Sequence, residues 1–211
     1  LVLSDKEIKS FFFFFYEIDT MYSCMFVVAL CTGLRIREAM ALAHAQIDNE
    51  LKTIKIQSMI KDGNLISAVK TRRGRKIRLS KTALANLERA KRHQQVFEKN
   101  EGYYNEYGLV FTTKEGRPLS YTTANRNLEE IVLKMGRPDL TNHSLRHTYM
   151  TVSTRCGENL DEIQNEVGHG YASDVITEYL HQTDESRHES AIRRQEYLMN
   201  IMSKYGAEDG N

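Results

Sequence analysis

Cysteine and proline are scarce in this chain of 211 residues, and tryptophan is absent. The three cysteines are odd in number and lack metal-like spacing, so we expect free thiols in a reducing compartment rather than a disulfide framework. A cytoplasmic location is the expectation that follows. The two prolines stand in turn positions, Pro118 after Gly-Arg and Pro138 between two expected helices.

An excess of one charge is also lacking, because 29 lysines and arginines oppose 28 aspartates and glutamates. Any contact with DNA must therefore depend on a local patch. The apolar run from Met21 to Leu34 is shorter than the roughly 18 residues that span a bilayer, so no membrane partner is expected. One basic patch occupies six of the nine positions from 70 to 78: Lys70, Arg72, Arg73, Arg75, Lys76 and Arg78.

No internal repeat or low-complexity linker divides the chain, and we treat residues 1–211 as a single domain. Its hydrophobic content of 41% and charged content of 27% are ordinary for a globular protein with one core. A Gly-x-Ser-x-Gly elbow, a P-loop and a dinucleotide-binding glycine fingerprint are all missing, and no cofactor is expected.

Caps and apolar spacing predict a mainly helical chain. Ser4, followed by acidic residues, opens a helix through the phenylalanines, and Ser80 caps another. Gly33 allows a turn before a short helix, and three later glycines are suitable helix stops. The remaining helices are expected at about 20–31, 36–43, 81–99, 121–135, 143–156, 160–167, 174–180 and 185–202.

Alternating apolar residues between 53 and 79 predict three short strands. The first contains Ile54 and Ile56, the second runs over 65–69, and the third contains Ile77 and Leu79. Asp62-Gly63-Asn64 and Arg73-Gly74-Arg75 are expected to form turns with positive φ. The predicted fold is therefore mainly α, with a small three-stranded antiparallel sheet whose tip is cationic.

A histidine and an arginine share one helical face in the segment His143-Ser-Leu-Arg146-His147. A guanidinium donates two parallel hydrogen bonds to phosphate oxygens, and Arg35 is a candidate second arm. Taken singly, Arg146 also fits a surface ion pair and His143 a capping role. His143 and His147 have metal-ligand spacing, but a third ligand is not evident and no metal is expected.

A phenol and an ammonium complete a set suited to phosphodiester chemistry. Tyr179 is a poor nucleophile unless bases or cationic neighbours assist it, and its ordinary role in a helix is packing. Lys70, just before the basic turn, is a candidate proton donor to a leaving 5′-oxygen, and Lys76 is the competing choice. Alternatively, the turn only binds DNA backbone phosphates through Arg72, Arg73, Arg75 and Lys76.

Taken in order, these segments resemble the motifs of the tyrosine recombinase (phage-type integrase) family. The resemblance runs from about Leu1 to Arg194. The similar segments are Thr32-Gly-Leu-Arg35-Ile-Arg-Glu38, Val69-Lys70-Thr71, His143-Ser-Leu-Arg146-His147-Thr148, Gly168-His169 and Tyr179-Leu-His181.

The resemblance implies a catalytic role for each of six residues. Arg35 and Arg146 clamp the scissile phosphate and Tyr179 attacks it to give a 3′-phosphotyrosyl link. Lys70 is then the general acid, His143 assists proton transfer and His169 supports the phosphate. No metal or cofactor takes part.

The resemblance also implies an assembly. This chain would be a catalytic domain that follows absent N-terminal DNA-binding domains. It would act as a homo-tetramer on paired duplex DNA sites, with accessory DNA-bending or excision factors, near the nucleoid of a bacterium. The isolated domain would be a monomer, and its C-terminal element at about 182–202 would pack either against a neighbouring protomer or in cis.

Three positions depart from the family pattern. Ser144 stands where an acidic residue is common, and His44 stands where a tryptophan is common. The interval from His169 to Tyr179 is one residue longer than is usual, which leaves Tyr171 as a less suitable alternative nucleophile.

The function expected from the resemblance is site-specific DNA cleavage and rejoining, for integration and excision of a mobile element. Two alternatives stay open. One is a DNA-binding relative that has lost catalysis. The other is an enzyme like a type IB topoisomerase, which relaxes DNA without pairing two sites.

Overall fold

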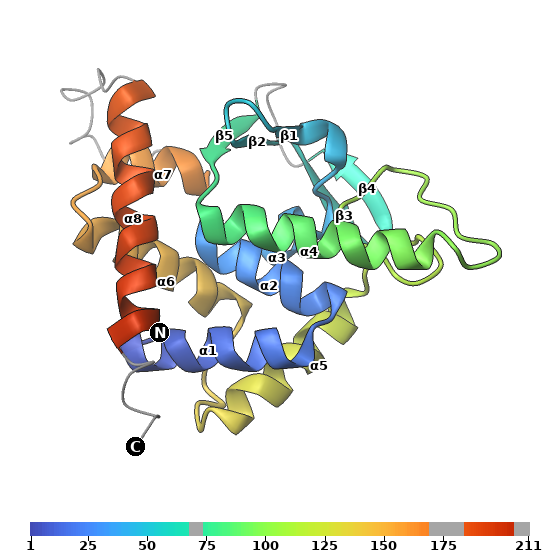
Figure 1. Ribbon diagram of the computed structural model, residues 1–211, viewed down its shortest axis with the longest axis horizontal. Helices are drawn as coiled ribbons and strands as arrows, with labels where there is room; N and C mark the ends of the chain where they lie inside the picture. Colours follow the sequence, from blue (N-terminus) through green and yellow to red (C-terminus); the bar gives the residue numbers. More distant parts are fainter. Residues whose placement is uncertain (68–73, 169–183, 205–211) are drawn as a thin grey trace.

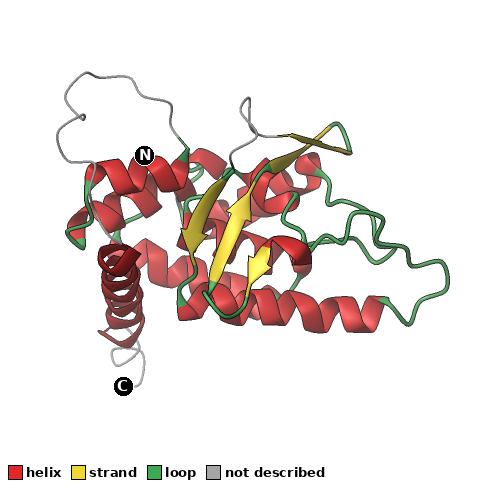
Figure 2. Ribbon diagram, turned by 90° about the horizontal axis from the view of Figure 1, so that it is seen from above, coloured by secondary structure: helices red, strands yellow, loops and turns green. Residues whose placement is uncertain are grey.

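The computed structural model describes the backbone of residues 1–67, 74–168 and 184–204, and the side chains of 1–67, 74–168 and 191–201. Helices make up most of it, and a small sheet covers one side of the helical body (Figures 1 and 2). The helices are α1 (Asp5–Ile18), α2 (Met21–Thr32), α3 (Ile36–Met40), a 3-10 turn η1 (His44–Gln46), α4 (Lys81–Phe97), α5 (Tyr121–Lys134), α6 (Asn142–Arg155), α7 (Leu160–Val167) and α8 (Asp184–Lys204).

The predicted helix ends are largely confirmed, because local caps determine them. The Ser4 hydroxyl and the Glu7 carboxylate form a reciprocal capping box at the start of α1. Gly136, Gly157 and Gly168 all have positive φ where helices stop. The short helix expected at 36–43 ends earlier, at Met40, and is followed by η1. The helix expected at 174–180 lies outside the described residues.

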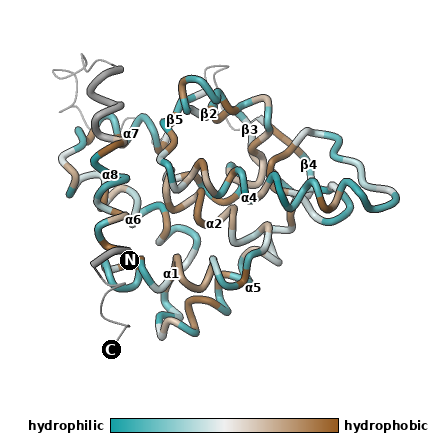
Figure 3. Tube along the Cα trace, viewed as in Figure 1, coloured by the Kyte–Doolittle hydropathy of each residue, from teal (hydrophilic) through white to brown (hydrophobic). Residues whose placement is uncertain are grey.

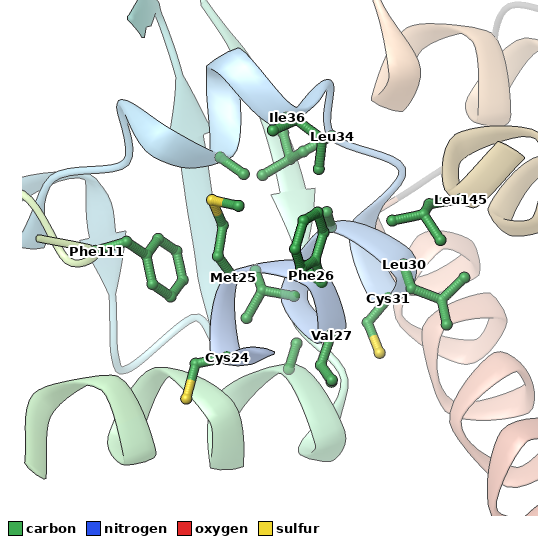
Figure 4. Packing of buried hydrophobic residues seen from close by; sticks show 14 of the residues in the cluster. Cys24, Met25, Phe26, Val27, Leu30, Cys31, Leu34, Ile36, Phe111 and Leu145 are labelled. Carbon is green, nitrogen blue, oxygen red and sulfur yellow. The ribbon is translucent and has the colours of Figure 1, made fainter. Parts of the chain in front are cut away.

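Helix α2 forms the centre of the core. Every residue of it except Tyr22 is buried, so it has no hydrophilic face, and a helix that is apolar all round must be covered by others. It packs against α1, α3, α4 and α6, and Figure 3 shows the concentration of apolar residues along it. Figure 4 shows Phe26, Met25 and Leu30 of α2 among Leu34, Phe111 and Leu145 from other segments.

The phenylalanine run of α1 joins this core on one face only. Phe11, Phe12 and Phe15 are buried, whereas Phe13 is exposed. The ring of Phe15 lies 5.2 Å from that of Phe26 in α2, measured between centroids. The first two helices therefore pack against each other. No helix in the described part of the chain is both long enough and apolar enough to cross a membrane.

The three-stranded sheet is present, but its membership differs from the prediction. Strands β1 (Ile47–Asp48), β2 (Thr53–Ile56) and β5 (Arg75–Arg78) form an antiparallel sheet in the order β1-β2-β5. The predicted second strand is β4 (Asn64–Ser67), and it pairs with β3 (Ser58–Lys61) in a separate hairpin. A tight turn at Asp62-Gly63 joins β3 directly to β4. Strand β3 lacks the alternation of apolar and polar residues that predicts a strand, so the sequence did not indicate this partner.

Glycine is needed at position 74 for a reason other than the one expected. Its φ is not among the positive values, so the predicted positive-φ turn is wrong at this residue. A Cβ on Gly74 would lie 2.5 Å from the carbonyl oxygen of Ile56, on the neighbouring strand β2. Glycine is therefore required by close approach of two backbones.

The C-terminal helix α8 lies against the helical body. It contacts α1, α6 and β5 (Figure 1). Among its described side chains, Ala191, Leu198 and Ile201 are the buried apolar ones. The three cysteines form no disulfide, as expected.

Gly33 connects the core helix α2 to the short helix α3, and the packing around it leaves no room for a side chain. Its φ is +66°, and a Cβ there would lie 2.4 Å from Cδ1 of Tyr149 in α6. The tyrosine ring is fully buried, so it has little freedom to move away.

We expect Gly33→Ala to destabilise the domain by about 3 kcal/mol, because left-handed backbone strain and overpacking add. Gly157→Ala is the matched control, since Gly157 also has positive φ but a Cβ would meet nothing within 4 Å. The control should lose only about 1 kcal/mol. Urea unfolding of both variants measures the difference, and equal losses would contradict the close packing of Gly33 on Tyr149.

Candidate phosphate-binding site

Arg35, His143 and Arg146, which the sequence places in two distant segments, line one cavity of about 130 Å³. Residues of α3 form one side of it and the start of α6 another. Met59 of β3 and Tyr121 of α5 also contribute. The full lining is Arg35, Ile36, Arg37, Glu38, Met59, Tyr121, Asn142, His143 and Arg146.

Arg35 is positioned by the turn that ends α2. Gly33 caps α2 in the left-handed conformation, and Arg35 then stands as the N-cap residue of α3. Glu38, three residues on, accepts hydrogen bonds from the Arg35 backbone N–H at 3.0 Å and from its Nη1 at 3.3 Å. The Arg35 side chain keeps 41% of its surface exposed, so its guanidinium remains accessible to a ligand.

Arg146 is the buried member of the pair, with 4% of its surface exposed. Its Nη1 donates to the Gly33 carbonyl at 2.7 Å, and its Nη2 donates to the Val167 carbonyl. Both acceptors recorded among the described residues are thus neutral. Burial, and then the positive charge of Arg35, lower the pKa of Arg146 to about 10, although the guanidinium stays charged at neutral pH.

His143 lies one helical turn before Arg146 at the start of α6 and is exposed. The i, i+3 spacing places both side chains on the cavity, as the sequence predicts.

Glu38 is one of the lining residues that the sequence did not identify as part of the site. It is 4% exposed and accepts two hydrogen bonds from Arg75, Nη1 at 3.0 Å and Nη2 at 2.6 Å. Burial alone would raise the pKa of the Glu38 carboxyl, but the hydrogen bonds and charge of Arg75, and then of Arg35, hold it below its ordinary value. One carboxylate therefore orients two arginines. The sequence signal that could have identified Glu38 is its place three residues after Arg35, at position N3 of α3, where a glutamate caps the start of a helix.

Arg75 has a different partner from the one expected. The sequence groups it with the DNA backbone contacts, whereas its side chain turns inward on β5 and is 14% exposed. Besides the paired bonds to Glu38, its Nε donates to the Glu166 carbonyl at 2.5 Å. These contacts give Arg75 a structural role behind the cavity, where it holds the lining residue Glu38.

The competing general acid, Lys76, does not line this cavity. It is exposed and pairs with Lys55 across the β2–β5 ladder, on the strand face opposite Arg75 and Ile77. It lines a separate hollow with Lys55 and Gln57. Lys76 thus lies away from Arg35 and Arg146, and the choice between Lys70 and Lys76 stays a prediction. Several predicted residues lie outside the described part of the chain: Lys70, Arg72, Arg73, His169, Tyr171 and Tyr179.

Arg37 and Tyr121 were also missed by the sequence reading. The guanidinium carbon of Arg37 lies 4.3 Å from the centre of the Tyr121 ring, and both residues line the cavity. This cation–π contact orders Arg37, the third arginine in the cavity lining.

One cluster elsewhere brings together three potential metal ligands. Single ligand atoms of Asp19, Cys24 and His93 lie within 4.8 Å of one another. Arg89 already donates to Asp19 at 2.6 Å, and burial raises the pKa of the Cys24 thiol to about 11. A cation beside the carboxylate disfavours a metal ion, so we assign this cluster as an ion pair between α1 and α4.

Positive charge thus dominates the cavity. Among the described residues, Glu38 is the one carboxylate in its lining, against Arg35, Arg37 and Arg146. Neighbouring guanidiniums repel each other in a partly buried site unless an anion lies between them. The planar donor geometry suits a tetrahedral oxyanion such as phosphate.

A model described as the phage integrase family matches residues 2–186. The chain belongs to this family. The match confirms the resemblance to tyrosine recombinases that the ordered boxes indicate.

Relatives of this integrase-family chain come from a bacterium and a bacteriophage. It is 29% identical over 174 residues to a "tyrosine recombinase XerC-like" protein of Caldanaerobacter subterraneus, covering 74% of this chain and 44% of that protein. It is 27% identical over 169 residues to the integrase of Staphylococcus phage L54a, covering 74% and 47%. The chain thus spans about half the length of these relatives.

Solved structures share the fold of this integrase-family domain. The Tn1549 transposon integrase in complex with transposon right end DNA gives a TM-score of 0.68 at 21% identity, over 92% of this chain and 65% of that one. The XerA recombinase gives 0.63 at 22% identity, over 92% and 65%. The mainly helical fold with a small sheet is therefore confirmed.

We expect Glu38→Gln to cost about 3 kcal/mol of stability at pH 7, because it leaves Arg75 without its buried counter-ion. The Glu38 pKa is lower in the folded state than its ordinary 4.5, so its contribution is complete above about pH 4.5 and is lost as the pH falls through the folded pKa. The difference between the wild-type domain and the variant should therefore shrink in acid. Glu130→Gln, on the exposed face of α5, is the control. Urea unfolding at pH 7 and pH 3 measures both, and a difference that does not vary with pH would contradict the ion pair.

Proposed function

We propose that this domain cleaves and rejoins DNA strands as the catalytic part of a site-specific recombinase, for integration and excision of a mobile element. The observation that carries the proposal is the convergence of Arg35, His143 and Arg146 on one cationic cavity. The names of the integrase, transposase and recombinase relatives support it.

The chemistry follows from where negative charge develops. Arg35 and Arg146 donate hydrogen bonds to the non-bridging oxygens of the scissile phosphate, whose charge increases in the transition state. The Tyr179 oxygen attacks phosphorus, the bond to the 5′-oxygen breaks, and Lys70 supplies the proton that this leaving group needs. The phenol proton leaves to a base, with His143 assisting and His169 supporting the phosphate.

The second half of the reaction reverses the first. A 5′-hydroxyl attacks the 3′-phosphotyrosyl link, the tyrosine leaves, and a phosphodiester is restored. Because the energy of the broken DNA bond stays in the tyrosyl ester, the proposed reaction requires neither a nucleotide nor a metal cofactor.

The proposed partner is double-stranded DNA, bound by a homo-tetramer on paired sites. Arg72, Arg73 and Lys76 contact the DNA backbone in this proposal, whereas Arg75 stays with Glu38. N-terminal DNA-binding domains and accessory factors select the sites, in a bacterial cytoplasm and near its nucleoid. The isolated domain is a monomer in this proposal.

Arg35→Ala should slow strand cleavage at least about a hundredfold, because one transition-state donor is worth on the order of 3 kcal/mol. Its exposed side chain makes this variant the one least expected to disturb folding. Arg35→Lys should recover only part of the rate, since an ammonium does not reproduce the bidentate geometry. Single-turnover cleavage of a suicide DNA substrate by the full-length protein gives the rates, and gel-shift titration gives the affinity. Equal losses of binding and cleavage would argue against a transition-state role.

The nucleophile is tested in the same assay. Tyr179→Phe should abolish the covalent protein–DNA adduct while DNA binding persists, because it removes only the attacking oxygen. Tyr171→Phe is the control and should form the adduct normally. An adduct that survives in Tyr179→Phe would refute the assignment of the nucleophile. If the wild-type protein binds DNA but never forms an adduct, the DNA-binding alternative replaces the proposal, and relaxation of plasmids without paired sites would favour the topoisomerase-like one.

A further inference from the structure

Arg194 of α8 is a buried charge that no step of the proposed reaction uses. It is 3% exposed, and its Nη1 reaches acceptors on α6 and around α7. These are the Tyr149 hydroxyl, Ser153 Oγ at 3.1 Å, Glu158 Oε2 at 3.1 Å and Glu166 Oε2 at 3.2 Å. The guanidinium also lies 4.7 Å from the centre of the Tyr149 ring.

Such a group is costly to bury, and only close counter-charges make it tolerable. Glu158 precedes α7 and Glu166 stands in its last turn, so a single side chain of α8 holds both ends of α7. The Tyr149 hydroxyl donates to the same Glu166 carboxylate, which adds α6 to the connection. Helices α6, α7 and α8 therefore meet at one guanidinium.

The last turn of α7 connects this network to the cationic cavity. The Glu166 side chain accepts from Arg194, while its backbone carbonyl accepts from Arg75 Nε at 2.5 Å. The next carbonyl, of Val167, accepts from Arg146. Arg75 in turn binds Glu38, which orients Arg35. A continuous set of hydrogen bonds thus runs from α8 to both phosphate-binding arginines.

Packing supports the same connection. A Cβ on Gly168 would lie 3.0 Å from Arg75 Nη1, so α7 ends in close contact with that guanidinium. The Tyr149 ring lies against Gly33, whose carbonyl accepts from Arg146. A shift of α7 or Tyr149 would therefore move the carbonyls that aim Arg146.

We propose that Arg194 is a positioning residue of the phosphate site: by holding Glu166 and Tyr149, it sets the carbonyls that orient Arg146 and Arg75. The expected effect of Arg194 on the reaction rate rests on the proposed function, whereas its expected effect on the geometry of the cavity does not. The C-terminal helix thereby becomes part of the catalytic apparatus, although none of its described side chains lines the cavity.

The experiment compares Arg194→Met, Arg194→Lys and Glu166→Gln in the full-length protein, with Arg193→Met as the control on the exposed face of the same helix. Hydrogen–deuterium exchange, well below the melting temperature of each variant, follows peptides covering 33–38, 142–149 and 160–168. Single-turnover cleavage and DNA affinity are measured in parallel.

We expect Arg194→Met to accelerate exchange over 33–38 and 160–168, and to slow cleavage about tenfold or more with DNA affinity unchanged. Arg194→Lys should be intermediate, because it keeps the charge but not the several directed bonds. Glu166→Gln should reproduce the effect more weakly, since Glu158 still pairs with Arg194. The control should match the wild-type protein in every assay.

A purely structural role predicts another pattern: a lower melting temperature, with exchange changes confined to α6 and α8 and a normal cleavage rate. That result overturns the inference. Should Arg194→Met fail to fold, Arg194→Lys and Glu166→Gln decide, because each retains a buried ion pair. If the wild-type protein forms no adduct, the proposed function fails, while the exchange data still confirm or overturn the positioning role.

Discussion

The geometry of the cationic cavity depends on one buried carboxylate shared by two arginines. Glu38 binds Arg35 from its own helix and Arg75 from a strand that lies far along the chain. Its two oxygens satisfy the inner guanidinium in a bidentate pair and restrain the outer one, so that the sheet and α3 are held in a fixed relation. A neutral side chain at position 38 would leave Arg75 buried without a counter-charge. A shift of β5 away from α3 would then be favourable.

Where α6, α7 and α8 meet, the arrangement is reversed, because one cation is shared by two carboxylates. At Arg194 one guanidinium meets the two carboxylates of Glu158 and Glu166. Burial, and then the charge of Glu166, outweigh Arg194 and raise the pKa of Glu158. The Glu166 carboxylate thus accepts from Arg194, whereas the carbonyls of Glu166 and Val167 accept from Arg75 and Arg146. This arrangement leaves the cavity cationic while still supplying acceptors that orient Arg146.

Local signals account for what the sequence predicted well. The helix starts at Ser4, Thr20 and Ser80 and the glycine stops depend on caps within a few residues, and these were correct. Strand partners depend on contacts across the chain, and the hairpin β3–β4 was therefore wrongly merged with the sheet. The spacing of His143 and Arg146 is also local, which is why their shared cavity was foreseen.

Residues that act through distant partners were not recoverable in the same way. Glu38, Arg75 and Arg194 are ordinary charged residues in the sequence, and each acquires its role from a partner that only the fold supplies. The inward turn of Arg75 illustrates the limit, because a run of six basic residues indicates a DNA-binding surface without revealing which member faces the core. Strand alternation offers the missing criterion: Arg75 shares a face with buried Ile77, whereas Lys76 shares its face with solvent. In a basic strand beside a recombinase-like cavity, the residues that face the core should therefore be separated from those that face solvent before any arginine is assigned to DNA.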